Sequence, residues 1–89
     1  MRVSQPPPAT DLRVTILLFA GLREQMGTAQ MTLRVPLGTT VQTLYRAVVP
    51  DRATGRIPVM FAVDEVYAGP STVLHDGAEV AFLPPLGGG

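Results

Sequence analysis

The sequence predicts an α+β fold in which one main helix covers a mixed sheet of four to five strands. Segments near both ends of the chain alternate side chains with a period of two, and one segment between them carries a single apolar stripe with helical spacing. With 89 residues the chain has room for one hydrophobic core. One amphipathic helix can cover one face of such a sheet.

The first strand is predicted over Leu12–Phe19, where the sequence reads LRVTILLF. By the two-residue period of a strand, one face carries Leu12, Val14, Ile16 and Leu18, and the other carries Arg13, Thr15, Leu17 and Phe19. The second face begins polar and ends apolar. We therefore expect a half-buried strand with an exposed apolar end.

The next segment completes a predicted hairpin. Leu22–Met26 is expected to form one helical turn that Gly27 stops. The stretch Ala29–Val35 alternates again, and Pro36 ends it because proline cannot donate to a strand ladder. We expect the two strands to pair, with Gly21–Gly27 as their connection.

The main helix is predicted after this hairpin. Its apolar stripe, at positions i, i+3, i+4 and i+7, consists of Val41, Leu44, Tyr45 and Val48. Thr39, followed three residues later by Gln42, has the pattern of a capping box at the helix start. Pro50 ends the helix because its ring clashes with the preceding turn.

The C-terminal half predicts short strands separated by turns. After a polar loop at Asp51–Arg56, extended segments are expected at Val59–Val63, Val66–Tyr67 and Ala78–Leu83, with turns at Gly69–Ser71 and His75–Gly77. In the last strand Val80 and Phe82 share one face, while Ala81 and Leu83 share the other. Because this strand cannot remain uncovered, it most economically pairs beside the first strand, in the sheet centre. That order of elements is a β-grasp, the ubiquitin-like arrangement.

The composition excludes several kinds of site. Without cysteine and with one histidine, the chain has no thiol nucleophile and little for a metal site or a catalytic triad, so no metal is expected. Seven arginines balance seven acidic residues, which predicts no nucleic-acid surface. No segment reads as a signal peptide or a membrane helix, so a cytoplasmic protein is expected. Zero net charge with 46% hydrophobic residues favours association with another protein.

Three segments are expected: a flexible proline-rich arm at residues 1–11, a β-grasp domain at 12–84 and a flexible glycine tail at 85–89. Pro84 and Pro85 stop the last strand and stiffen the start of the tail. The final four residues, Leu86–Gly89, span at most about 14 Å when extended. Without Cβ atoms, the glycines can enter a channel that any side chain would block.

The carboxylate of Gly89 is a poor electrophile until it is converted to a mixed anhydride. An adenylating partner can do this with ATP, and a sulfur nucleophile can then displace AMP. The product is a terminal thiocarboxylate, which would let a chain without cysteine carry sulfur. Gly88 would keep the channel passable.

Four fragments resemble the MoaD/ThiS sulfur-carrier family: LLFAGLREQMG, GTTVQTLYRAV, FAVDEVYAG and LHDGAEVAFLPPLGGG. The resemblance runs from about Leu12 to Gly89, and the DG-x-EVAF-x-PP-x-x-GG ending is its most specific part. It implies a β-grasp protein without an active site or bound cofactor of its own. Gly89 would be adenylated by an E1-like adenylyltransferase that consumes ATP, and would then be thiolated. The carrier would dock into the large catalytic subunit of molybdopterin synthase and donate sulfur to cyclic pyranopterin monophosphate in molybdenum cofactor biosynthesis.

The resemblance also implies a docking patch. Family members use the positions of Phe19, Tyr67 and Leu83 to pack against the partner subunit, and alternation independently places Phe19 and Leu83 on the outward face. The residues before the reactive end are expected to contact the partner too: Pro84, Pro85, Leu86 and Gly87. Gly87 departs from the Ser, Thr or Ala of many relatives, which predicts a more flexible tail.

Other interpretations of the same residues stay open. The chain could be a sulfur carrier for thiamine, cysteine or tRNA thiolation, or a ubiquitin-like modifier that forms isopeptide bonds through Gly89; the longer Phe-x-Pro-Pro approach to the glycines favours the molybdopterin pathway. A β-grasp interaction module with an inert tail is the alternative of another class. Asp64, where relatives often have Asn, is interpreted as turn chemistry. His75 is interpreted as structural, and Met26, Met31 and Met60 as core side chains.

Overall fold

A sheet and two helices make up the part of the chain that the structure, a computed structural model, describes: residues 11–49 and 59–84. The elements are β1 (Asp11–Leu18), α1 (Ala20–Met26), β2 (Gln30–Pro36), α2 (Val41–Val48), β3 (Met60–Val63), β4 (Val66–Ala68) and β5 (Glu79–Leu83). Predictions for the arm before Asp11, for Pro50 and the loop after it, and for the tail after Pro84 lie outside these ranges. Asp11, assigned to the arm from the sequence, is the first residue of β1.

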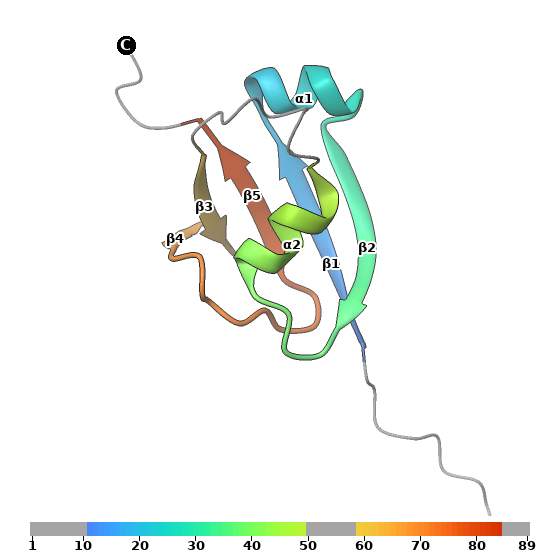
Figure 1. The fold of residues 1–89 in the computed structure, drawn as a ribbon, viewed down its shortest axis with the longest axis vertical. Coiled ribbons are helices and arrows are strands. Elements are labelled where there is room, and N and C mark those ends of the chain that lie inside the picture. Colours follow the sequence, from blue (N-terminus) through green and yellow to red (C-terminus); the bar gives the residue numbers. More distant parts are fainter. Residues whose placement is uncertain (1–10, 50–58, 85–89) are drawn as a thin grey trace, which may run out of the picture.

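The strands pair in the order β2-β1-β5-β3-β4 (Figure 1). β1 and β5 run parallel, and the other neighbouring pairs are antiparallel. The last strand therefore lies beside the first in the centre of the sheet. This confirms the predicted β-grasp order and the β1–β2 hairpin.

One face of this sheet is covered by α2, as Figure 1 shows. Side chains of the two central strands are inaccessible to solvent on this face: Val14, Ile16, Val80 and Phe82. On the same face, the rings of Tyr45, Phe61 and Phe82 pack edge to face, with centroids 5.0 to 5.8 Å apart. Such aromatic packing stabilises a core beyond the area that it buries.

The connection between β1 and β2 is a longer helix than predicted. α1 includes Ala20 and Gly21 in addition to the predicted turn and has seven residues. Leu22 is buried in the core, and this contact stabilises a helix too short to persist alone. Gly27 ends the helix as predicted, in the left-handed conformation at φ 74°, with its N–H donating to the Arg23 carbonyl.

The start of α2 differs from the capping-box prediction by one residue. Thr40 is the N-cap, because its hydroxyl accepts the Thr43 N–H at 3.2 Å. The Thr39 hydroxyl instead donates to the Pro36 carbonyl at 2.6 Å and fastens the loop after β2. Both threonines have a side chain suited to capping, so residue type alone does not distinguish them.

Candidate functional site

No helix or strand among residues 11–49 and 59–84 covers the face of the sheet opposite α2, which is called the open face below. The strand registers place Leu17, Ala81 and Ala62 side by side in one row across this face. Since side chains alternate along a strand, the paired residues Leu83 and Met60 point to the same face. Met60 lies outside the core cluster, so the prediction that it fills the core is wrong. Met60 and Ala62 alternate along β3 with Phe61, which packs against the core, and the pairing of β3 with β5 shows that Met60 and Ala62 belong to the open face.

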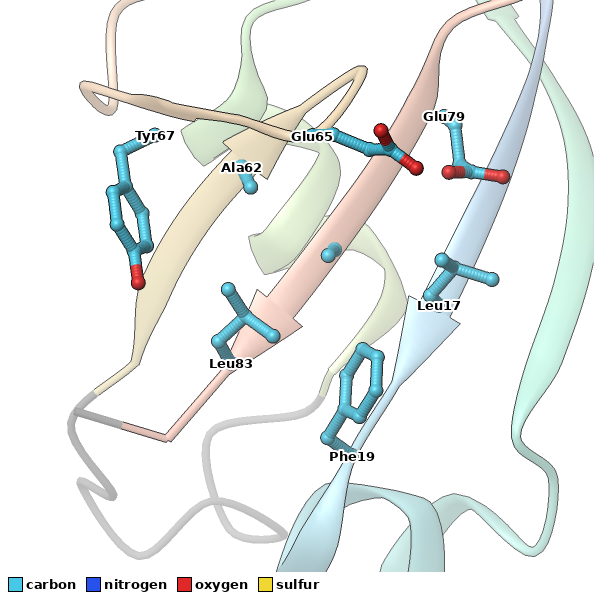
Figure 2. Close-up of a pocket in the computed structure, with 8 residues that line it drawn as sticks. Leu17, Phe19, Ala62, Glu65, Tyr67, Glu79 and Leu83 are labelled. Carbon is cyan, nitrogen blue, oxygen red and sulfur yellow. The ribbon is translucent and has the colours of Figure 1, made fainter. Parts of the chain in front are cut away.

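An apolar hollow occupies the centre of the open face (Figure 2). The residues that line it are Leu17, Phe19, Ala62, Glu65, Tyr67, Glu79, Ala81 and Leu83. Ala62 and Ala81 are small, so they leave room between the larger side chains around them. A concave apolar surface on the outside of a domain is typical of a binding site.

The three side chains predicted for the docking patch all line this hollow. Phe19 is 40% exposed and Tyr67 is 56% exposed, while Leu83 is partly buried. They come from three separate segments: the residue after β1, the middle of β4 and the last residue of β5. The structure brings these residues together, and their role in docking stays a prediction.

The backbone around Phe19 explains how its side chain reaches the open face. Phe19 is the N-cap of α1, with extended backbone angles of φ −130° and ψ 155°. Its side chain therefore continues the alternation of β1. Ala20, at φ 52°, then turns the chain into the helix.

The end of β5 brings the chain to the edge of the hollow. Leu83 is the last residue of this strand, and the exposed Pro84 follows it. The chain thus leaves the sheet beside the predicted docking patch. The other predicted tail residues lie outside the described part of the chain: Pro85, Leu86, Gly87, Gly88 and Gly89.

Two acidic side chains, Glu65 and Glu79, also line the hollow and are missing from the sequence-based prediction. Glu79 is the first residue of β5 and shares the face of Ala81 and Leu83. Alternation along this strand is therefore sufficient to predict that Glu79 lies on the open face. Glu65 belongs to the turn between β3 and β4. Its placement depends on positive φ angles at Asp64 and Glu65, 51° and 70°, which are typical of a type I′ hairpin turn.

A hydrogen-bonded pair, Asp64 and His75, fastens this turn to β5. Asp64 Oδ2 lies 2.6 Å from His75 Nε2, and Asp64 Oδ1 accepts the Glu79 N–H at 3.0 Å. The other ring nitrogen, His75 Nδ1, lies 2.9 Å from the Asp76 carbonyl oxygen. Because a carboxylate and a carbonyl both accept, the ring that donates from both nitrogens, the imidazolium, is favoured.

These contacts shift two pKa values. The side-chain hydrogen bond to Asp64 raises the pKa of His75, and the bond to the Asp76 backbone acts in the same direction. The Glu79 N–H, followed by the hydrogen bond to His75, lowers the pKa of Asp64. Both side chains are exposed and neither lines the hollow. The pair therefore joins the β3–β4 turn to the start of β5, in keeping with the structural interpretation of His75 and Asp64.

Two other features are absent from residues 11–49 and 59–84. Within these ranges, no three histidine, aspartate or glutamate side chains gather in a way that could hold a metal ion. Neither helix there has the length and apolar composition needed to cross a membrane.

Comparison with known proteins finds similarity along nearly the whole chain. The ThiS family matches residues 16–89. The molybdopterin synthase sulfur carrier subunit of Arabidopsis thaliana is 32% identical over 83 residues, covering 90% of this chain and 86% of the relative. The protein of the same name from Mycobacterium tuberculosis is 34% identical over 87 residues, covering 88% of this chain and 99% of the relative.

Solved structures share the fold. Small archaeal modifier protein 1 from Methanosarcina acetivorans matches with a TM-score of 0.72 over 91% of this chain and 100% of that protein. The sequence identity is 22%, so this likeness concerns the β-grasp architecture alone.

Proposed function

This chain belongs to the ThiS family of sulfur carriers, and on that premise we propose that it is the sulfur-carrier subunit of a molybdopterin synthase. The observation that carries the proposal is the apolar hollow at the point where the chain leaves β5 toward Gly89. A carrier of this kind needs such a surface, because another protein must hold its body while its terminus reacts. The relatives that bear this subunit's name support the choice of pathway.

The proposed chemistry takes place at the carboxylate of Gly89. One carboxylate oxygen attacks the α-phosphorus of ATP on an E1-like adenylyltransferase, and pyrophosphate leaves. A sulfur nucleophile of the hydrosulfide type then attacks the acyl carbon and displaces AMP, leaving the thiocarboxylate. ATP is thus consumed by the partner, and the carrier itself binds no cofactor.

The proposed second partner is the large catalytic subunit of molybdopterin synthase, on which sulfur passes to cyclic pyranopterin monophosphate. Phe19, Tyr67 and Leu83 would dock against this subunit. The segment after Leu83 would run into its active site: Pro84, Pro85, Leu86, Gly87 and Gly88. Prolines at its start limit the conformations that docking must order, and glycines at its end fit a narrow channel.

The intact mass of the protein from its native host tests sulfur carriage. We expect a polypeptide that ends at Gly89 and is heavier by the difference between one sulfur and one oxygen. Deletion of Gly89 should abolish this mass shift, while the unfolding midpoint stays unchanged because the residue follows the last strand. A chain that stays unmodified with ATP, sulfide and the adenylyltransferase would contradict the proposal.

The pathway needs a separate measurement. The thiocarboxylated protein, mixed with the large subunit and cyclic pyranopterin monophosphate, should yield molybdopterin and return to its unmodified mass. Sulfur release only to enzymes of thiamine, cysteine or tRNA thiolation would assign another pathway. Covalent adducts on partner lysines would instead indicate a protein modifier.

A further inference from the structure

The two acidic side chains of the hollow gather at the end of it that is remote from the exit of the chain. Glu79 is the first residue of β5 and Leu83 the last, so the two lie about 13 Å apart along the strand. Glu65 reaches the same end from the β3–β4 turn, and Figure 2 shows both carboxylates extending over the hollow. The hollow is therefore apolar where the chain leaves and acidic at its other end.

No positive charge neutralises these two side chains within residues 11–49 and 59–84. Neither carboxylate has an ion pair or a hydrogen bond there, whereas Asp11 is 3.5 Å from Arg34 and Asp64 is paired with His75. Glutamate is negatively charged at neutral pH, so two like charges converge beside an apolar surface. A complementary cation would relieve this repulsion.

The backbone conformation of Glu65 is unusual for its residue type. Its φ of 70° lies in the left-handed region, where glycine or asparagine is the favoured residue of a type I′ turn. The chain nevertheless carries a long acidic side chain there. That choice is unfavourable locally and puts a charge at the rim of the hollow.

We propose that the hollow receives a partner segment whose apolar side chain covers Ala62 and Ala81 and whose arginine lies between Glu65 and Glu79. This rests on the proposed function, and the partner is the large subunit. Arginine fits better than lysine, because a planar guanidinium can donate to two carboxylates at once.

The two charges would fix the orientation of the partner, which the apolar patch alone does not. Apolar contact is non-directional, so Phe19, Tyr67 and Leu83 alone would tolerate rotation of the partner within the interface. An ion pair at the far end fixes the orientation of the carrier on the large subunit. The exit beside Leu83 then faces the same point of the partner each time, which a short reactive tail requires.

A charge-reversal experiment on the purified full-length carrier and the large subunit from the same organism tests this. Glu65→Arg combined with Glu79→Arg should raise the Kd at least about tenfold, because like charges then face each other in the interface. Glu24→Arg, on the exposed surface of α1 and outside the hollow, is the matched control and should change the Kd by less than about twofold. Unfolding midpoints measured for all variants should agree with that of the wild type.

Salt dependence gives an independent measurement. The wild-type Kd should rise between low and physiological NaCl concentration, and that of the double variant should not, because its attractive pair is gone. A double variant that binds like Glu24→Arg, with an unchanged salt dependence, overturns the inference. A concentration-dependent wild-type dimer that the double variant abolishes would assign the hollow to a second copy and overturn it as well.

These outcomes separate this inference from the proposed function. If the wild-type protein carries sulfur and binds the large subunit but the charge reversals have no effect, only the inference fails. If the wild-type protein does not bind the large subunit, both fail.

Discussion

The two faces of the sheet are both apolar at their centre, yet within the described residues, 11–49 and 59–84, only one of them is covered by a helix. On the covered face, Val80 and Phe82 of β5 lie beneath α2 and are inaccessible to solvent. On the open face, Ala81 and Leu83 of the same strand line the hollow and remain partly exposed. Alternate residues of one strand thus belong to two different surfaces.

This difference indicates that the two faces of the central strands have different roles, one in stability and the other in contact with a partner. The covered face supplies most of the buried apolar area, which is the main source of stability in a small domain. The open face exposes apolar side chains that give little stability in return, and such a surface is typical of a partner contact. Substitutions on the two faces should therefore affect different measurements.

The largest effect is expected from Phe82→Ala. The ring is fully buried and lies 5.0 Å from that of Tyr45 between centroids, so its removal leaves a cavity in the core. We expect the free energy of unfolding to fall by about 3–5 kcal/mol. Urea denaturation followed by circular dichroism measures this.

The control for Phe82→Ala is the next residue on the other face. Leu83→Ala should lower the free energy of unfolding by about 1 kcal/mol, because this side chain is only partly buried. Equal losses of unfolding free energy for the two variants would mean that side chains on the covered and open faces contribute equally to stability.

The second-largest effect is expected on the open face, where a substitution should weaken binding more than it lowers stability. Phe19→Ala should lower the free energy of unfolding by only about 1 kcal/mol, since the residue is 40% exposed. On the proposed function, it should weaken binding to the large subunit by about 2 kcal/mol, roughly a 30-fold rise in Kd, which is typical of a central aromatic contact. Isothermal titration calorimetry measures the Kd.

The chain offers a matched control for this substitution. Leu37 is also a large exposed apolar residue, at 66%, but it does not line the hollow. Leu37→Ala should change neither quantity. A similar loss of binding in both variants would show that the hollow has no special part in docking.

Much of this comparison can be predicted from alternation alone. The period of two in β1 and β5 assigns the buried and outward side chains of both strands correctly, because each strand has one clearly apolar face. The order of the strands follows from the need to bury the last one. Alternation also identifies Phe19 and Leu83 as outward residues that meet.

The rest depends on pairings and turns that no single segment reveals. Met60 points outward because of its register with Leu83, which is set by contacts between distant segments. Glu65 reaches the hollow only through the positive φ of its turn. Thr40 and not Thr39 is the N-cap because the Thr39 hydroxyl already donates to the Pro36 carbonyl in the preceding loop.

The smallest effect concerns the Asp64–His75 pair, which joins residues eleven positions apart at the acidic end of the hollow. Asp64→Asn removes the charge but keeps an oxygen that can accept the Glu79 N–H, and asparagine tolerates the left-handed φ of this position. We expect the pKa of His75 to fall toward its ordinary value, because the hydrogen bond to Asp64 is the main cause of its rise. Titration of the His75 ring protons by NMR measures this, and Asp11→Asn, a charge removed from the start of β1, should leave the pKa of His75 unchanged.

The same pair predicts how stability depends on pH. The pKa of His75 is raised, so its contribution is complete below about pH 6.5, the ordinary histidine value, and is lost as the pH rises through the folded-state pKa. The pKa of Asp64 is lowered, so its contribution is complete above about pH 3.9 and is lost as the pH falls through the folded-state pKa. The wild type should therefore exceed Asp64→Asn in stability most clearly between these two values, and only slightly, because both side chains are exposed. A stability difference that does not vary with pH would show that Asp64 acts through its turn geometry and not through its charge.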